Sequence, residues 1–473
     1  MLNEKKIRKA FAGAVMNKTT SGSTLMNFLE LPSDVKSWVL QKFIDENGEL
    51  QAFEMSEYVK EMRLKPAEWN IKLLEARHSA KGQIKLLTKV KIEFDYGKDL
   101  TCFSLPEYGF PKKKPDAQVD WSVISEHKDY LLDPNGAWGE ITLCYDCGMT
   151  QLVNFKPLCP YTFNLKKYQE GRKQFTVEEW INVLISGLNF NPDALDNDAK
   201  LTLLQRFLPF VEKRLNQIEL AIKGSGKSYC YSQLSAYNWL TAGTVSRATA
   251  FFNNTTKQTG YFSSYDNVIW DEVQTLKCTN ADEMNAALKG YLESGEIRTG
   301  SYNGTADAGL TLVGNIPTAS MDIEKHNMFT TLPKMLKESA LIDRFTGIIE
   351  GWKIGRFSED KKYEGWGLSS NYLTGMFHAL REEFYYRAIV DELIETEGSC
   401  DTRNLEAIKK TTTAYLKLLY PQIKKASDIN KADFRKYCLN PAIRMRWGVL
   451  CQLRYLDEEY NDVKMPTIKI KGE

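Results

Sequence analysis

Histidine is scarce in this sequence, with only four among 473 residues. The sequence therefore does not favour a catalytic metal site with histidine ligands, because such sites use several imidazoles. Long apolar runs are also missing. No window offers about 18 uninterrupted apolar residues, and residues 1–20 lack the apolar core of a signal peptide. We expect a cytoplasmic protein without a membrane segment.

An excess of one charge is absent as well: 62 basic and 61 acidic side chains give a net charge of +1. Any DNA binding must therefore come from a local patch or a pore rather than from overall basicity. Nine cysteines are spread without dense regular spacing, which favours reduced thiols over a disulfide framework. The length predicts roughly two to four compact units.

Two cysteines, Cys144 and Cys147, have the spacing of a zinc turn, and Cys159 follows them. A closed zinc site needs four ligands, and no second CxxC or nearby histidine pair completes this one. The run from Ile141 to Cys147 also alternates as a strand does, with the cysteines as small apolar residues. Both interpretations stay open.

A glycine loop follows a short apolar run, Ile218 to Ile222, and consists of Gly224, Ser225, Gly226, Lys227 and Ser228. The pattern predicts a strand, a phosphate loop and a helix. In such a loop, backbone N–H groups converge on a polyphosphate, Lys227 reaches the outer phosphates, and the Ser228 hydroxyl helps to hold Mg²⁺. We therefore expect ATP and Mg²⁺ as cofactors.

The loop departs from the full pattern at its first position, where Ala221 replaces glycine. Alanine tolerates a positive φ poorly. Either the loop begins in a conformation that alanine accepts, or phosphate binding is weakened.

Three later segments place polar residues at the ends of apolar ones. A strand predicted over residues 265–270 ends in Asp271 and Glu272, which suit the Mg²⁺ shell and the activation of water. Another strand ends in Asn315, whose amide can orient that water. Arg344 follows a short apolar helix and suits a finger that reaches a neighbouring subunit, because we find no use for it within its own subunit. Together they favour an α/β AAA+ P-loop ATPase that assembles into a ring.

Six motifs resemble a known family: KGSGKSYCYSQLS, NVIWDEV, ALKGYLESGEIRTGS, LTLVGNIP, LIDRFTGIIEGW and TRNLEAIKKTTTAYLKLLYP. They resemble the ATPase core of BrxL, the Lon-like AAA+ family of bacterial BREX phage-defence systems, which is similar to the core of MCM helicases. The resemblance extends upstream through GRKQFTVEEWINVLISGLNFNP and FAGAV. It implies a homo-oligomeric, MCM-like ring, a hexamer, that binds or translocates double-stranded DNA alongside other defence-system proteins.

BrxL proteins carry a Lon-type peptidase-like domain after the ATPase, and we find no segment here that is long enough to supply it. We therefore expect ATPase activity and no protease activity.

The resemblance also implies roles for residues outside the glycine loop. Asn303-Gly304 signals a hairpin, which corresponds to the pre-sensor hairpin that points into the channel of MCM-like rings. Arg298 would meet a phosphate and Tyr302 a sugar or base face, with Lys289 as a further DNA contact. An ordinary surface hairpin is the alternative. Arg403 matches the second sensor arginine of MCM-like ATPases.

We expect three regions: residues 1–165 as a mixed α+β domain for DNA or partner recognition, 166–360 as the ATPase core, and 361–473 as a helical lid with further helices. Periodicity predicts helices over residues 201–215 and 231–240. A basic cluster over residues 424–454, which includes Arg446, either lines the DNA path or balances acidic residues elsewhere.

Two other function classes compete with a DNA motor. A protein-remodelling unfoldase would use the same ATP site, but such pores usually present an aromatic pair, whereas this hairpin offers Arg298 beside Tyr302. A nucleotide-gated assembly scaffold would show little hydrolysis. Comparing ATP turnover in the wild type and in Glu272→Gln separates the scaffold from both motors.

Overall fold

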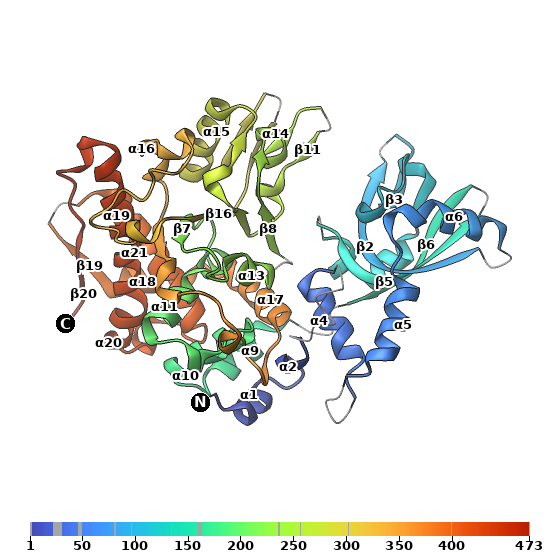
Figure 1. Ribbon diagram of the computed structural model, residues 1–473, viewed down its shortest axis with the longest axis horizontal. Coiled ribbons are helices and arrows are strands. Elements are labelled where there is room, and N and C mark those ends of the chain that lie inside the picture. Colours follow the sequence, from blue (N-terminus) through green and yellow to red (C-terminus); the bar gives the residue numbers. More distant parts are fainter. Residues whose placement is uncertain are drawn as a thin grey trace. The chain divides into compact units, whose positions relative to one another are not determined.

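The computed structural model describes residues 2–21, 31–45, 50–79, 82–95, 97–133, 135–146, 148–158, 163–234, 237–255, 257–300, 302–398 and 400–472. The chain divides into two compact units (Figure 1). One comprises Met1–Gly22 and Phe163–Glu473, and the other comprises Ser23–Thr162. The first residues therefore belong to the larger unit, whereas the sequence led us to expect them in the N-terminal domain.

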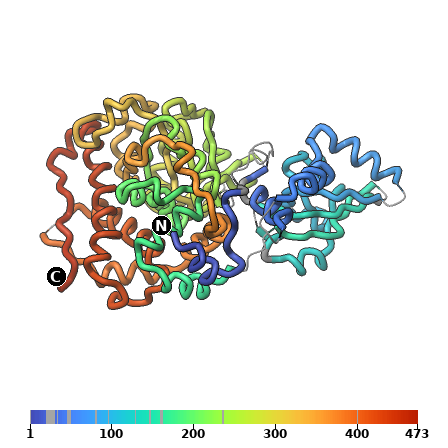
Figure 2. Tube along the Cα trace, turned by 60° about the horizontal axis from the view of Figure 1, so that its bottom comes forward, coloured from blue at the N-terminus to red at the C-terminus, as the bar shows by residue number. Residues whose placement is uncertain are grey.

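The N-terminal segment packs on the larger unit through α1 (Glu4–Ala10), β1 (Val15–Asn17) and α2 (Lys18–Ser21). β1 pairs antiparallel with β18 (Trp366–Leu368). In Figure 2 this dark blue trace lies beside the orange segment that contains β18. The Phe11 ring centroid lies 5.9 Å from that of Trp180, and the buried Lys18 donates from Nζ to the Gly187 carbonyl at 2.9 Å. Apolar and polar contacts together fix the segment to the larger unit.

The smaller unit contains a closed five-stranded barrel with strand order β2-β3-β4-β6-β5. Neighbouring strands are antiparallel except β4 and β6, which are parallel. A five-stranded Greek-key barrel of this kind is typical of OB folds. The elements are α4 (Ser33–Lys42), α5 (Ala52–Met62), α6 (Trp69–His78), β2 (Gln83–Asp95), β3 (Leu100–Ser104), β4 (Ala117–Val119), α7 (Trp121–Glu126), α8 (Lys128–Leu131), β5 (Ala137–Asp146) and β6 (Met149–Pro157).

The predicted strand that begins at Ile141 is confirmed as part of β5, which contains Cys144. Cys147 and Cys159 lie outside the described residues. Among the residues that the structure describes, no three or more histidine, cysteine, aspartate or glutamate side chains are grouped so that they could hold a metal ion.

The larger unit is built on a five-stranded parallel sheet in the order β17-β7-β16-β12-β8. The strands are β7 (Gln217–Ala221), β8 (Asn238–Thr241), β12 (Asn267–Trp270), β16 (Gly309–Asn315) and β17 (Gly347–Glu350). Every residue of β7, β12 and β17 is buried, as expected for a parallel sheet that is covered on both faces. Ligands of such sheets bind outside the carboxyl ends of the strands.

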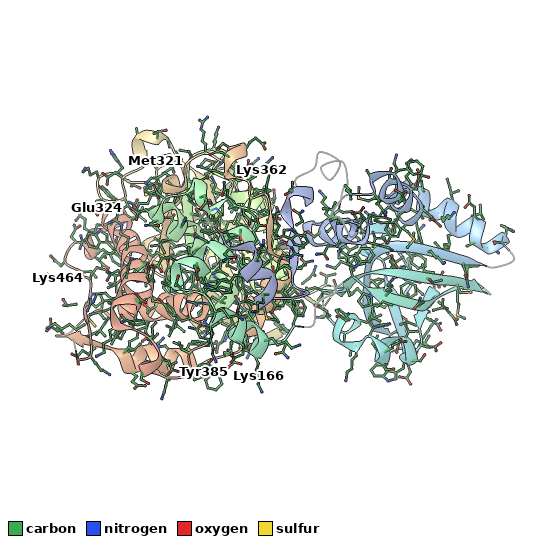
Figure 3. All side chains as sticks on the ribbon, turned by 90° about the horizontal axis from the view of Figure 1, so that it is seen from below. Lys166, Met321, Glu324, Lys362, Tyr385 and Lys464 are labelled. Carbon is green, nitrogen blue, oxygen red and sulfur yellow. The ribbon has the colours of Figure 1, made fainter. Side chains whose placement is uncertain are left out.

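Helices complete the larger unit. Thr176 caps α10 (Val177–Gly187) with a capping box, and Asp401 caps α19 (Thr402–Leu419). Glu324, labelled in Figure 3, accepts from Arg444 of α21 at 2.8 Å. Further helices and strands of this unit are α9 (Leu165–Arg172), α10 (Val177–Gly187), α11 (Asn197–Gln205), α12 (Leu208–Val211), α13 (Lys227–Ser232), α15 (Ala281–Ser294), α16 (Ser339–Ile342), α17 (Ser370–Arg381), α18 (Tyr385–Leu393), β19 (Ile394–Glu397), α19 (Thr402–Leu419), α20 (Lys431–Phe434), α21 (Asn440–Leu456) and β20 (Thr467–Ile470). No helix within the described ranges is long and apolar enough to span a membrane.

Two helices predicted from periodicity are wrong in extent. The helix expected over residues 201–215 is divided into α11 and α12, and Pro209 lies in the first turn of the second piece, since proline is tolerated in the first turn of a helix but not in its interior. The helix expected over residues 231–240 ends at Ser232, and Trp239 and Leu240 belong to β8. Parallel pairing with β12 overrides the local helical preference there.

The predicted hairpin exists, but its turn differs from the prediction. β14 (Glu296–Thr299) pairs with β15 (Tyr302–Thr305), and Thr299 faces Tyr302 across the pair. The chain therefore reverses between those residues, while Asn303 and Gly304 lie within β15. The segment between β8 and β12, which we call the insertion, forms β9 (Thr244–Val245), α14 (Arg247–Ala250), β10 (Phe252–Asn253) and β11 (Gln258–Thr259). β9 pairs with β13 (Lys277–Cys278).

Candidate nucleotide-binding site

The glycine loop leaves β7 at the carboxyl edge of the sheet and leads into α13. Gly224 and Gly226 have φ values of +74° and +70°, a region that glycine adopts without steric cost. Ala221 is the last residue of β7, fully buried and paired with Asn315 of β16. Its backbone belongs to a strand, so alanine fits this position without the positive φ that raised doubt about it.

Four predicted residues meet where β7, β12 and β16 end. Lys227 donates from Nζ to Asn315 Oδ1 at 3.0 Å, and Ser228 Oγ donates to Asp271 Oδ2 at 2.7 Å. Burial lowers the pKa of Lys227 below its ordinary value. A hydroxyl and a carboxylate are ligand types that Mg²⁺ prefers, and an ammonium beside them suits phosphate oxygens. The residues present therefore fit ATP with Mg²⁺.

Glu272, which follows Asp271, has an unusual backbone. Its φ is +50°, in the left-handed region that few residues other than glycine adopt. Its N–H donates to Asp271 Oδ1 at 2.8 Å, and its side chain is exposed. Strained residues of this kind cluster at functional sites, and an exposed carboxylate beside Asp271 can accept a proton from water.

The two predicted catalytic arginines lie together on one carboxylate. Arg344 Nε is 3.0 Å, and Arg403 Nη2 is 3.1 Å, from Glu293 Oε2. Arg403 Nη1 also lies 2.5 Å from Asp343 Oδ2. The argument that Arg344 has no use within its own subunit is therefore wrong, because Glu293 neutralises it there.

Arg344 lies near the amino ends of the sheet strands, whereas the glycine loop lies at their carboxyl ends. It precedes β17, whose first residue, Gly347, pairs with Gln217, the first residue of β7. The loop leaves the other end of β7, which is roughly 13 Å away along a strand of this length. Arg403 lies near Arg344, because both pair with Glu293.

Arg446 holds the turn that carries Arg344, a role that the sequence did not suggest. It is fully buried, and its Nη1 donates to the carbonyls of Asp343 and Phe345, on either side of Arg344, at 3.0 and 2.6 Å. Its Nη2 lies 2.5 Å from Asp343 Oδ1. Burial lowers the pKa of Arg446, although Asp343 opposes that shift. In the sequence, Arg446 stood out only as one member of the basic cluster over residues 424–454.

The three predicted DNA contacts do not lie on one element: Arg298 and Tyr302 belong to the hairpin, and Lys289 belongs to α15. The Arg298 side chain is 72% exposed and lies 2.5 Å from Glu296 Oε2. Tyr302 stacks on Phe252 with ring centroids 4.2 Å apart and planes 6° apart, so one face of its ring is covered. Lys289 instead belongs to α15, where it pairs with a carboxylate of Glu338 at 2.6 Å.

The inserted segment contacts the hairpin through Arg247, which donates from Nη2 to the Arg298 carbonyl at 2.8 Å. Arg247 Nη1 lies 2.5 Å from Glu283 of α15. A groove of about 250 Å³ lies beside these residues and is lined by Arg247, Phe251, Ala286, Ala287, Gly290, Ser294, Glu296, Ile297, Arg298 and Thr299. Sequence reasoning did not single out Arg247, whose only signal was its place in the insertion.

Two family models match most of the sequence. The model of the "Lon-like protease BrxL-like, ATPase domain" matches residues 150–466, and that of the "BREX system Lon protease-like protein BrxL N-terminal" region matches residues 9–145. The chain belongs to the BrxL family. The resemblance recognised in the motifs is thereby confirmed, and the glycine loop and its partners lie within the BrxL ATPase domain.

Two curated BrxL relatives are similar to the chain. The Lon-like protease BrxL of Escherichia coli O9:H4 (strain HS) is 27% identical over 397 residues, which are 82% of this chain and 55% of the relative. The Lon-like protease BrxL of Bacillus cereus (strain H3081.97) is 31% identical over 269 residues, which are 56% of this chain and 39% of the relative. The chain thus matches about half the length of one BrxL relative and less of the other.

Proposed function

We propose that this chain is an AAA+ ATPase that forms a ring and hydrolyses ATP at the interfaces between its subunits. Residues 166–360 would be the ATPase core and the helices of 361–473 its lid. The observation that supports this proposal is the position of two groups on one sheet. The glycine-loop cluster lies at the carboxyl ends of the strands, and the Arg344–Arg403 pair lies near their amino ends. Head-to-tail contacts that close into a ring bring such groups of neighbouring subunits together. Membership of the family with the BrxL ATPase domain supports the activity.

Each residue of the cluster has a role in this proposal. When bound, ATP with Mg²⁺ supplies the phosphoryl group and a cation that neutralises its developing charge. Lys227 would exchange Asn315 for phosphate oxygens, and Ser228 and Asp271 would hold the cation. The freed Asn315 amide orients a water molecule, from which Glu272 accepts a proton.

The two arginines would act on the neighbouring subunit's nucleotide. In the separate chain, both arginines pair with Glu293, and Arg403 also pairs with Asp343. At an interface, phosphate oxygens would offer the same guanidinium groups charge-assisted, bidentate hydrogen bonds. Hydrolysis would then require assembly, because the site lacks its arginines until two subunits meet.

Mixing inactive subunits tests this arrangement. We expect Lys227→Ala and Arg344→Ala each to lower turnover by roughly 10³-fold or more. Random assortment of an equal mixture pairs an intact loop with an intact arginine at about one quarter of the interfaces, so turnover should recover to about that fraction. A mixture of Lys227→Ala with Glu272→Gln is the control and should recover nothing, because both defects lie on the loop side of the interface. Failure of the first mixture to recover would refute catalysis between subunits.

We further propose that the ring acts on double-stranded DNA within a BREX-type defence system. The supporting observation is the exposed Arg298, carried on a hairpin that Arg247 joins to the inserted segment. The stacked Tyr302 and Phe252 are not presented as a free aromatic pair, since Phe252 is buried. That arrangement favours DNA over a polypeptide as the substrate.

The test of DNA engagement is ATP turnover with and without duplex DNA at low and raised salt. We expect stimulation by DNA, its loss in Arg298→Ala, and its retention in Lys325→Ala, a control whose side chain is 78% exposed and also paired with a nearby carboxylate. Raised salt should weaken binding steeply, because counterions compete for phosphates. Turnover that ignores DNA, with no salt-sensitive binding, would refute the proposal and favour a protein substrate.

A further inference from the structure

A buried ion pair lies beneath the glycine loop. Arg206, which follows α11, and Glu219, in the middle of β7, are both completely buried. Arg206 Nη2 is 2.6 Å from Glu219 Oε1, and its Nε is 3.0 Å from Oε2. Burying two charges is costly, and it is tolerated when the geometry is good and the remaining donors and acceptors are satisfied. The partners of the remaining groups are therefore informative.

Those partners belong largely to the glycine loop. Arg206 Nη1 donates to the Gly226 carbonyl and Nη2 to the Ser225 carbonyl, both in long hydrogen bonds of 3.4 Å. The Tyr231 hydroxyl of α13 donates to Glu219 Oε2 at 3.3 Å. Burial alone would lower the pKa of Arg206, but the Glu219 carboxylate raises it above its ordinary value overall. The guanidinium is therefore charged where it meets the loop.

The orientation of two peptide planes follows from these contacts. In a trans peptide, the C=O and the N–H point in opposite directions. The carbonyls of Ser225 and Gly226 point towards Arg206, and that of Gly226 also accepts from the Cys230 N–H of α13 at 2.9 Å. The N–H groups of Gly226 and Lys227, which share those peptide planes, therefore point away from Arg206. These are the donors that a phosphate loop offers to its ligand.

We propose that Arg206, fixed by Glu219, is a positioning residue that keeps the glycine loop in its phosphate-binding conformation. This role rests on the proposed nucleotide function. Arg206 is not a contact of the nucleotide, since its donors are used by Glu219 and by the loop carbonyls. Its removal should weaken nucleotide binding while the sheet and its core remain intact.

The variant must remove both charges. Arg206→Met alone would strand Glu219 unpaired in the interior, whereas replacing a whole buried pair by apolar residues of similar size is often neutral for stability. The double variant Arg206→Met/Glu219→Leu therefore separates positioning from folding. Lys417→Met/Glu212→Leu is the matched control, because it removes another largely buried pair, at 3.0 Å, that has no contact with the loop among the interactions described.

The experiment measures ATP–Mg²⁺ affinity by calorimetry, the apparent KM and kcat, and the thermal midpoint without ligand. For Arg206→Met/Glu219→Leu we expect an affinity loss of about tenfold or more, seen in KM rather than in kcat, with a midpoint close to that of the wild type. The control should keep wild-type affinity. Arg206→Lys, which keeps a charge for Glu219 but cannot span both carbonyls, should lose less affinity than the double variant.

The outcomes are distinguishable. Wild-type protein that binds ATP, beside a folded double variant of equal affinity, would overturn the positioning role alone. Wild-type protein that binds neither ATP nor inorganic tripolyphosphate would overturn the nucleotide function, and this inference with it. If the double variant does not fold, Arg206→Lys decides, and unchanged affinity in that variant overturns the role.

Discussion

Removal of Arg446 should be among the most damaging single changes in the larger unit. Arg446→Met deletes a fully buried guanidinium that binds the Asp343 carboxylate, two backbone carbonyls and the side chain of Asn404, whose Oδ1 lies 2.6 Å from Nε. Methionine fills a similar volume, so the lost contacts dominate the effect. Asp343, itself 6% exposed, would lose one of its two arginine partners and keep Arg403.

The magnitude follows from burial. Removing one partner of a buried ion pair costs about 3–5 kcal/mol, because the other charge stays in the interior. Arg387→Met provides the control. Arg387 also binds two carboxylates, of Asp391 and Glu406, but all three side chains are substantially exposed, and exposed pairs contribute only about 0.2–1 kcal/mol.

Urea unfolding of the larger unit checks this difference, with Asp343→Asn added to close a double-mutant cycle. The coupling energy between Arg446 and Asp343 should be roughly 1–3 kcal/mol. Arg446→Met protein that remains folded should also bind ATP normally but turn it over slowly, because the turn that carries Arg344 is no longer held. If Arg446→Met costs no more than Arg387→Met, the reasoning from burial is refuted.

Two further predictions concern Lys18 and Ala221. Burial lowers the pKa of Lys18 to about 7, so the unfolded chain, with a pKa of roughly 10.4, binds more protons between about pH 7 and pH 10. The free energy of unfolding should therefore rise with pH across that window, by up to roughly 3 kcal/mol more than in Lys18→Met. Denaturation of both proteins at pH 7 and 9.5 measures this, and an equal change with pH in the two proteins would contradict it. Ala221→Gly should leave ATP affinity within about twofold and lower stability by roughly 0.5–1 kcal/mol, because the strand backbone gains nothing from glycine. Calorimetry and thermal unfolding check it, and a tenfold gain in affinity would show that the loop needs glycine there.

The ends of the sheet strands were predictable from the sequence. Apolar runs that end in Asp271 and Asn315 predicted that these side chains would meet Lys227 and Ser228, and the hydrogen bonds place them together. The prediction worked because parallel strands bring their carboxyl ends to one edge. Local sequence patterns were therefore sufficient to predict contacts between residues that follow neighbouring parallel strands.

Other features depended on partners far away in the sequence. The sequence pattern around Trp239 and Leu240 predicts a helix, but these residues form an edge strand because they pair in parallel with β12. The neutralisation of Arg344 by Glu293 joins residues 51 positions apart. Arg206 and Glu219 did carry a signal, since each is a charge within an apolar run, but only the fold shows that they face one another.

The discontinuous larger unit determines how the barrel can be removed. A chain that starts at residue 163 would lose more than the barrel: it would also lose β1, leave the edge of β18 unpaired and empty the space that Phe11 fills among its aromatic neighbours. Excision of residues 23–162 with the two ends rejoined would keep those contacts. For the same reason, a protease that cuts only one of the two connections would leave the barrel covalently attached, so cleavage alone would not release it as a free fragment.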